Sequence, residues 1–272
     1  MKRLPPPAPW RLLLTLATLR RRGGALPSGL WQWQGEALQA SDWQRYAERL
    51  DYPPLQGAPL CFHYLALQRA QLQAMLAPDF PHPLPGMVHL AQTLTREAPW
   101  QAAEPWHLTL TMEQTETPSG ALHLRMRAAF VQHGTCVLRA DSLYLARRSP
   151  RRDTAPPAAQ TAPDLRPLSD WALNADAGRR YARLSGDFNP IHLWAWSARW
   201  FGQREPIIHG MHSAARCEAE LTRHLGRPLQ HLHIEFRRPL GLPNRATLHL
   251  QEESGFELRD DAGRRVAKGN FA

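Results

Sequence analysis

The chain has 272 residues and a formal net charge of +9, and because Lys2 and Lys268 are its only lysines, this charge is almost entirely arginine. A hydrophobic content of 43% with 21% charged residues excludes a disordered protein. The three cysteines are widely spaced and form no Cys-x-x-Cys pair, which argues against a disulfide framework or a zinc site and favours the reducing cytoplasm. The basic charge favours anionic partners, but no zinc finger or aromatic-basic signature supports nucleic acid as one of them.

The first residues, MKRLPPPAPWRLLLTLATLRRR, combine a basic start with a short apolar run. No small-x-small cleavage site follows the run, and the run is far shorter than the roughly 20 residues that span a bilayer. Leu12, Leu16 and Leu19 fall on one helical face. We therefore expect an amphipathic helix packed on the protein, with neither a targeting segment nor a membrane span.

The first part of the chain, residues 1–148, has one helical stretch followed by strand-like runs. The apolar sequence from Tyr64 to Leu76 predicts a buried or half-buried helix. Polar and apolar residues then alternate as in half-buried antiparallel strands. These runs begin at Met87, Trp106, Ala121 and Thr135.

Residues 149–167, SPRRDTAPPAAQTAPDLRP, are rich in proline and alanine and predict a linker. In residues 168–272 a predicted helix over about 208–225 is again followed by four strand-like runs. One helix followed by an antiparallel meander thus occurs twice. The order predicts an α+β fold with two curved antiparallel sheets, each wrapped around a central helix and related by pseudo-symmetry.

Two motifs stand in the second part: YARLSGDFNPIH from Tyr181 to His192, and EPIIHGM, which ends at Met211 where the helix opens. Taken singly, Ser-Gly-Asp and Asn-Pro are ordinary loop sequences, and His-Gly-Met could be no more than a helix start. Together and in this order, the two blocks resemble the signature of the MaoC-like dehydratases and (R)-specific enoyl-CoA hydratases, which have the hot-dog fold. The sequence FPHPLPGMVHLAQTL in the first part is similar to the degenerate first repeat of double hot-dog members.

This resemblance implies reversible hydration of trans-2-enoyl thioesters to (3R)-3-hydroxyacyl thioesters. Asp187 and His192 would hold and activate one water, with histidine's ordinary pKa suited to proton transfer in both directions. The N–H of Gly210, near a helix N-terminus, would stabilise the thioester oxygen, and Asn189 would support the loop. No metal or redox cofactor is implied, because the thioester of coenzyme A, or of acyl carrier protein, supplies the activation. A monomer and a homodimer are both feasible.

Other interpretations remain open from the sequence. A hot-dog thioesterase would not explain the Asp187 and His192 block, whereas a non-catalytic protein that binds acyl thioesters, or a nucleic-acid binder, would explain neither that block nor Gly210. Trp194, Trp196 and Trp200 crowd the loop between the motifs and put substrate size and access in question.

Two pairs of histidines, and two arginines, also call for an interpretation. His209 and His212 have helical i,i+3 spacing, but without an evident third metal ligand a packing role is expected. His231 and His233 alternate along one predicted strand, where surface or packing roles suffice. Arg237 and Arg238 either meet substrate phosphates or form a solvated strand end.

Overall fold

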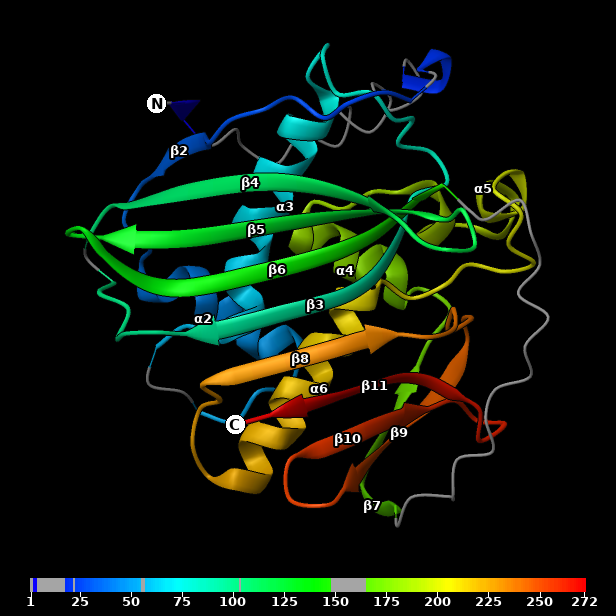
Figure 1. The fold of residues 1–272 in the computed structure, drawn as a ribbon. Coiled ribbons are helices and arrows are strands. Elements are labelled where there is room, and N and C mark those ends of the chain that lie inside the picture. Colours follow the sequence, from blue (N-terminus) through cyan, green and yellow to red (C-terminus); the bar gives the residue numbers. More distant parts are fainter. Residues whose placement is uncertain (1, 4–17, 22, 55–56, 103, 148–164) are drawn as a thin grey trace.

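The computed structural model describes residues 2–3, 18–21, 23–54, 57–102, 104–147 and 165–272 (Figure 1). The predicted N-terminal helix lies outside these residues except at its end, where Thr18–Arg20 form a short 3-10 turn, η1. The predicted linker lies outside them as well, except that a strand begins at Leu165, within its expected range. Among the described residues, no helix is both long and apolar enough to cross a membrane.

All the described strands belong to one sheet, in the order β1-β2-β4-β5-β6-β3-β8-β11-β10-β9-β7. The strands of the first part are β1 (Lys2–Arg3), β2 (Trp31–Gly35), β3 (Val88–Arg96), β4 (Trp106–Glu116), β5 (Leu122–Gln132) and β6 (Thr135–Arg147). Those of the second part are β7 (Leu165–Leu173), β8 (His231–Phe236), β9 (Asn244–Gln251), β10 (Gly255–Arg259) and β11 (Arg265–Phe271).

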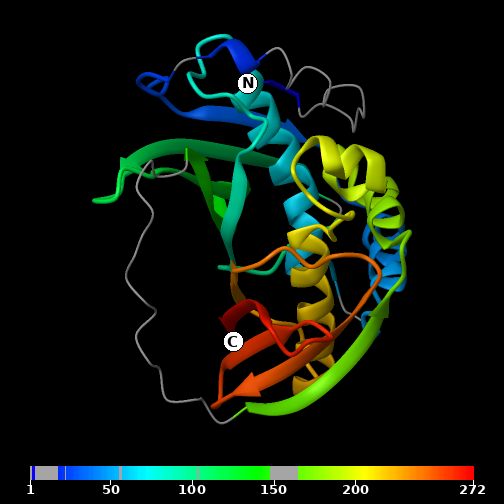
Figure 2. The same cartoon turned by 90° about the vertical axis from the view of Figure 1, so that its right-hand side faces the viewer.

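The helices lie on one side of this sheet (Figure 2). They are α2 (Ala40–Arg49), α3 (Leu60–Leu76), α4 (Ala177–Ser185), α5 (Ala195–Trp200) and α6 (Gly210–Leu225), with a 3-10 turn, η2, at Pro190–His192. The predicted helix over 64–76 is therefore confirmed and starts earlier. Most residues of α3 are buried, on more than one face of the helix, because α3 packs against both the sheet and α6.

The strands follow the alternation seen in the sequence. Along β5 every second residue is buried, namely Leu122, Leu124, Met126, Ala128 and Phe130. Side chains of a strand point alternately to the two faces of the sheet, so one face of β5 packs on the helices. The predicted meander needs a correction, because only β4-β5-β6 and β9-β10-β11 are meanders. The strand after each central helix crosses over, so that β3 pairs with β6 and β8 with β11.

The two parts have the same topology, and we call them the first unit (β2 to β6) and the second unit (β7 to β11). Each unit runs strand, helix, central helix and four strands, and its strand order in the sheet is the same. Strands β3 and β8 join the units in an antiparallel pair, with Thr93 opposite His233. The central helices α3 and α6 pack against each other behind this seam (Figures 1 and 2). An antiparallel seam between units of equal topology is a pseudo-twofold arrangement, joined into one continuous sheet.

Several elements were not predicted from the sequence, namely β2, α2, β7, α4 and α5. Strand β7 contains Pro167, which lacks an N–H to donate, and its register with β9 shifts between Pro167 and Ser169. Because β7 is the last strand of the sheet, it needs only one set of ladder hydrogen bonds, and proline is tolerated at such an edge. The proline that indicated a linker thus lies within an edge strand.

Candidate active site

The motif YARLSGDFNPIH forms the end of α4 and the loop into η2. Helix α4 ends at Ser185, and Gly186 follows in the left-handed conformation with φ 79°, which glycine adopts without strain. The Asn189 side chain then caps η2 by accepting the N–H of Ile191 at 3.3 Å. These turns place Asp187 and His192 at the same wall of the cavity, close to each other, as the resemblance implied.

The loop lies close to α4 because of Gly178, whose role gives no signal in the sequence. A Cβ atom at Gly178 would collide with the backbone carbonyl of His192. The carbonyl of Leu193 also accepts a hydrogen bond from the Arg179 guanidinium at 2.7 Å. Helix α4 therefore positions the loop at His192 through the close approach at Gly178 and the hydrogen bond from Arg179.

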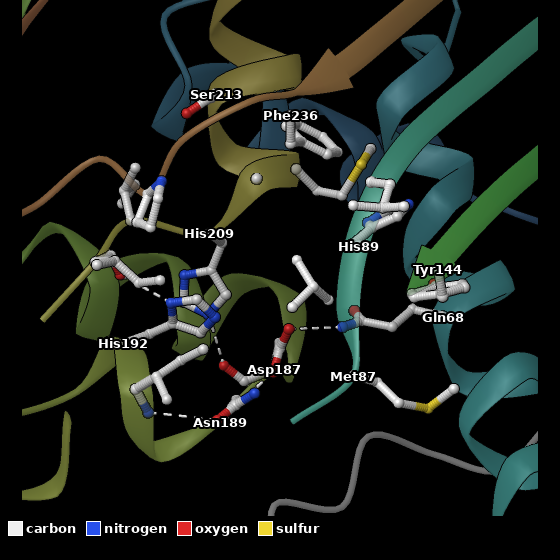
Figure 3. Close-up of a pocket in the computed structure, with 18 of the residues that line it drawn as sticks. Gln68, Met87, His89, Tyr144, Asp187, Asn189, His192, His209, Ser213 and Phe236 are labelled. Carbon is white, nitrogen blue, oxygen red and sulfur yellow. Dashed lines mark hydrogen bonds between the residues drawn. The ribbon is translucent and has the colours of Figure 1, made fainter. Parts of the chain in front are cut away.

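Hydrogen bonds hold the two predicted catalytic side chains in defined states (Figure 3). The His192 Nδ1–H donates to the carbonyl of Ile207 at 2.8 Å. Since a carbonyl only accepts, Nδ1 carries the proton and Nε2 keeps its lone pair. The Asp187 Oδ1 atom accepts the Asn189 N–H at 3.1 Å, and its Oδ2 atom accepts the Gln68 amide at 2.7 Å. Each group thus presents an acceptor.

His209, for which a packing role was expected, lies in the site instead. Its ring stacks on that of His192 with 3.7 Å between the ring centroids. Its Nε2–H donates to the Asp187 carbonyl at 2.9 Å, and its Nδ1 atom is buried without a hydrogen-bond partner. His209 therefore fixes the Asp187 backbone by a hydrogen bond and packs on one face of the His192 ring. Its spacing from His212 in the sequence gave no sign of this role.

The surroundings oppose positive charge on His192. Burial lowers the pKa of His192 and the adjacent His209 lowers it further, which outweighs the opposing effects of Asp187 and the Ile207 carbonyl. Burial alone would raise the pKa of Asp187, but His209, His192, the Asn189 N–H and the Gln68 amide together lower it below its ordinary value. Near neutrality the pair is a carboxylate beside a neutral imidazole.

Gly210 is the first residue of α6, at the helix N-terminus that the sequence predicted. None of the described residues accepts a hydrogen bond from its N–H, as is usual for the first turn of a helix. A Cβ atom here would lie 3.0 Å from the Phe236 ring. A larger residue here would thus have to displace the Phe236 ring by a few tenths of an ångström, so glycine fits this helix start best.

A cavity of about 640 Å³ connects these groups with the first unit. Asp187, His192 and Gly210 line it from the second unit, and so do Arg237 and Arg238. The first unit contributes apolar and polar side chains, among them Tyr64, Gln68, Leu72, Met87, His89 and Tyr144. Sequence analysis assigned no site residue to the first unit, because those contacts arise only when β3 pairs with β8.

The three tryptophans do not line this cavity. Trp194, Trp196 and Trp200 are 45%, 56% and 79% exposed, and they contact one another around α5. The cavity does not depend on their side chains. His231 and His233 lie at the seam between the units, where their Nδ1 atoms bond Thr95 and Thr93 at 2.8 Å.

Among the described residues, no third ligand joins the pair His209 and His212, but His209 lies in a different group of side chains that could hold a metal ion. One ligand atom each from Asp187, His192 and His209 lies within 4.8 Å of the others. Two of the ring nitrogens already donate to backbone carbonyls, which leaves His192 Nε2 and His209 Nδ1 as the available nitrogens. His212 is not part of this group. Its ring meets that of Tyr181 edge-on.

Residues 155–266 match the family model described as MaoC like domain. A segment of 92 residues is 36% identical to 3-hydroxyacyl-thioester dehydratase X of Mycobacterium tuberculosis, and this match covers 34% of the chain and 31% of that relative. The matched part therefore spans about a third of the curated relative's length.

The fold extends over most of the chain. The crystal structure of HtdX from Mycobacterium tuberculosis superposes with a TM-score of 0.74 at 19% identity, covering 89% of this chain and 99% of that one. A conserved hypothetical protein of the same organism with a double hotdog fold gives a TM-score of 0.58 at 13% identity, covering 91% and 96%. The predicted α+β double hot-dog fold is confirmed.

Proposed function

Since residues 155–266 carry a MaoC-like domain, as the two motifs indicated, we propose that the protein hydrates trans-2-enoyl thioesters to (3R)-3-hydroxyacyl thioesters, or runs the reverse dehydration. The single observation that carries the proposal is the paired acceptors: a carboxylate and an unprotonated imidazole nitrogen at one cavity wall. A water that donates to two acceptors at about 2.8 Å each holds them about 4.5 Å apart. The two side chains are close enough for such a water, because one ligand atom of each lies within 4.8 Å of one of the other.

In the proposed hydration, the water donates one hydrogen to Asp187 and the other to His192 Nε2. As its oxygen bonds to C3 of the substrate, His192 takes a proton and the electrons of the double bond move toward the thioester oxygen. The same proton then passes from His192 to C2, so that water adds across one face and no group is left changed. This is general acid–base catalysis by one residue in two directions.

The open N–H of Gly210 is proposed to donate to the thioester oxygen as it becomes enolate-like. It lies at the start of a 16-residue helix, where the helix dipole favours negative charge. An N–H donor of this kind is worth about 3 kcal/mol in the transition state. The apolar side chains of the first unit would take the acyl chain, and the arginines at the cavity would meet the phosphates of coenzyme A or of a carrier protein.

The test is hydration of crotonyl-CoA and longer trans-2-enoyl-CoAs, followed by loss of enone absorbance, with chiral analysis of the product. Asp187→Asn and His192→Ala should each lower kcat/KM by about 10²–10⁴-fold, while both variants stay folded. Asp261→Asn, at an exposed position of the second unit outside the cavity, is the control and should stay within twofold. An enzyme with no turnover on either coenzyme A or carrier-protein thioesters would overturn the proposal.

A second candidate is hydrolysis of the thioester, in which the same water would attack the carbonyl carbon instead of C3. Release of free thiol in the same assay would identify it. A non-catalytic acyl-thioester binder would bind enoyl-CoA without consuming the enone. Cytoplasmic location, and a monomer or homodimer, are part of the proposal.

A further inference from the structure

The first unit has a helix N-terminus that corresponds to the one in the active site, but a side chain fills it. The N–H groups of Leu60 and Cys61, at the start of α3, donate to the Glu218 carboxylate at 2.6 and 2.9 Å. The Tyr52 hydroxyl donates to the same carboxylate at 2.8 Å. In the second unit, the N–H of Gly210 at the equivalent helix start remains open to the cavity.

The residue that fills the first unit's helix start has a counterpart in the other unit. Glu218 stands at the same number of residues from the start of α6 at Gly210 as Gln68 stands from the start of α3 at Leu60. Each of these side chains reaches from its own central helix into the opposite unit. Glu218 meets the N-terminus of α3, whereas Gln68 meets Asp187.

Because each central helix sends one side chain to the opposite unit, we propose that Gln68 is a positioning residue. Through it, the first unit, which has no catalytic motif, orients the Asp187 carboxylate. This inference rests on the proposed function for its effect on turnover, but not for the contact itself. The Gln68 Nε2 atom lies 2.7 Å from Asp187 Oδ2, and the Asn189 N–H fixes the other oxygen (Figure 3). With both oxygens held, the plane of the carboxylate is fixed, and each oxygen of this cavity-lining residue keeps a further lone pair that can accept.

The chemistry of the two equivalent positions explains why one is glutamine and the other glutamate. At Asp187 the partner is an anion, so the reaching side chain must donate, and an amide does so without adding charge. At α3 the partners are backbone N–H groups, so the reaching side chain must accept, and a carboxylate does so with the helix dipole in its favour. Exchanging the two residue types would place two carboxylates together at the active site.

The experiment measures the pKa of Asp187 in the full chain by ¹³C NMR of labelled aspartate carboxyls, with the resonance assigned by its loss in Asp187→Asn. Gln68→Leu, of similar size, should raise this pKa by about one unit, and Gln68→Glu should raise it further. Gln73→Leu is the matched control for the titration, because Gln73 stands on the same helix but bonds Trp33. It should leave the pKa of Asp187 unchanged.

Turnover on crotonyl-CoA is measured on the same samples. Gln68→Leu should lower kcat about tenfold with KM within twofold, and Gln68→Glu should move the acidic limb of the pH profile upward. An unchanged Asp187 pKa in both Gln68 variants would overturn the inference, whatever the turnover of those variants. A shifted pKa in a protein without any turnover would support the contact and count instead against the proposed function.

Discussion

The two units share a strand order, a central helix and even the triplet Arg-Tyr-Ala, which places Tyr46 in α2 and Tyr181 in α4, yet Asp187 and His192 both come from the second unit. In the first unit the chain passes from α2 to α3 over a short connection. In the second unit the corresponding connection is extended by η2 and α5 and carries Asp187 and His192. The fold thus supplies two similar helix starts: Glu218 of the opposite unit meets the start of α3, whereas the N–H of Gly210 at the start of α6 has no acceptor among the described residues.

The sharpest way to test this comparison is to remove the open N–H while keeping the helix. Gly210→Ala and Gly210→Pro share the crowding against Phe236, but only proline lacks the N–H, and proline is well suited to the first position of a helix. We expect kcat of Gly210→Pro to be about 10²-fold below that of Gly210→Ala. Equal kcat values for the two variants would mean that the N–H does not contact the reacting thioester.

The first unit should depend on its filled helix start for stability. Glu218→Ala leaves two backbone N–H groups and the Tyr52 hydroxyl without their acceptor, so the free energy of unfolding should fall by about 3 kcal/mol. Chemical denaturation measures this loss. Gln68→Leu, at the equivalent position, should cost less than 1 kcal/mol, and a similar loss in both variants would contradict the division of roles.

Acid should destabilise both units through their buried histidines. Burial lowers the pKa of His63 in the first unit and of His212 in the second to about 3, and that of His89 to about 4. Since the unfolded state takes up these protons near pH 6.5, the free energy of unfolding should fall as pH drops below that value. Each histidine contributes about 1.4 kcal/mol per pH unit until its folded pKa is reached.

Denaturation at a series of pH values, with His63→Phe and His212→Phe beside the wild type, measures these contributions. Each substitution should lower the slope of the free energy of unfolding against pH by the contribution of one histidine. An unchanged slope in both variants would show that these rings are already charged in the folded protein.

The smallest effect is expected from metal removal. Asp187, His192 and His209 come close enough to bind an ion, whereas the first unit brings no comparable group together among the described residues. The proposed mechanism needs only the unprotonated His192 Nε2, so dialysis against a chelator should change kcat less than twofold. A loss of activity that Zn²⁺ or another divalent ion restores would assign the three side chains to a metal.

The sequence predicted the elements with a strong local pattern. The apolar helix from Tyr64 and the alternating strands of both units were recognisable because a periodic burial pattern is a local property. The motif likewise placed Asp187 and His192 together, because Gly186 and Asn189 set the turn between them.

What the sequence missed depends on contacts across the seam or between backbones. Gln68 stands on a helix with no motif that marks it. His209 stands in the second motif, but nothing local shows that its ring meets His192 and the Asp187 backbone. Gly178 matters only because the His192 carbonyl lies where its side chain would be. Strand β7 was hidden by Pro167, which indicated a loop until its place at the sheet edge was known. Such features are set by the pairing of distant segments, which a local pattern cannot show.

The joining of the two units into one continuous sheet has a consequence for how such a protein diverges. In a homodimer of identical subunits, a substitution at one side of the twofold axis is copied at the other, so the same residue must serve both places. Covalent fusion removes that constraint. Glutamine can then occupy position 68 while glutamate occupies position 218. One unit can line the cavity and hold Asp187 in place, while the other unit carries the candidate catalytic residues.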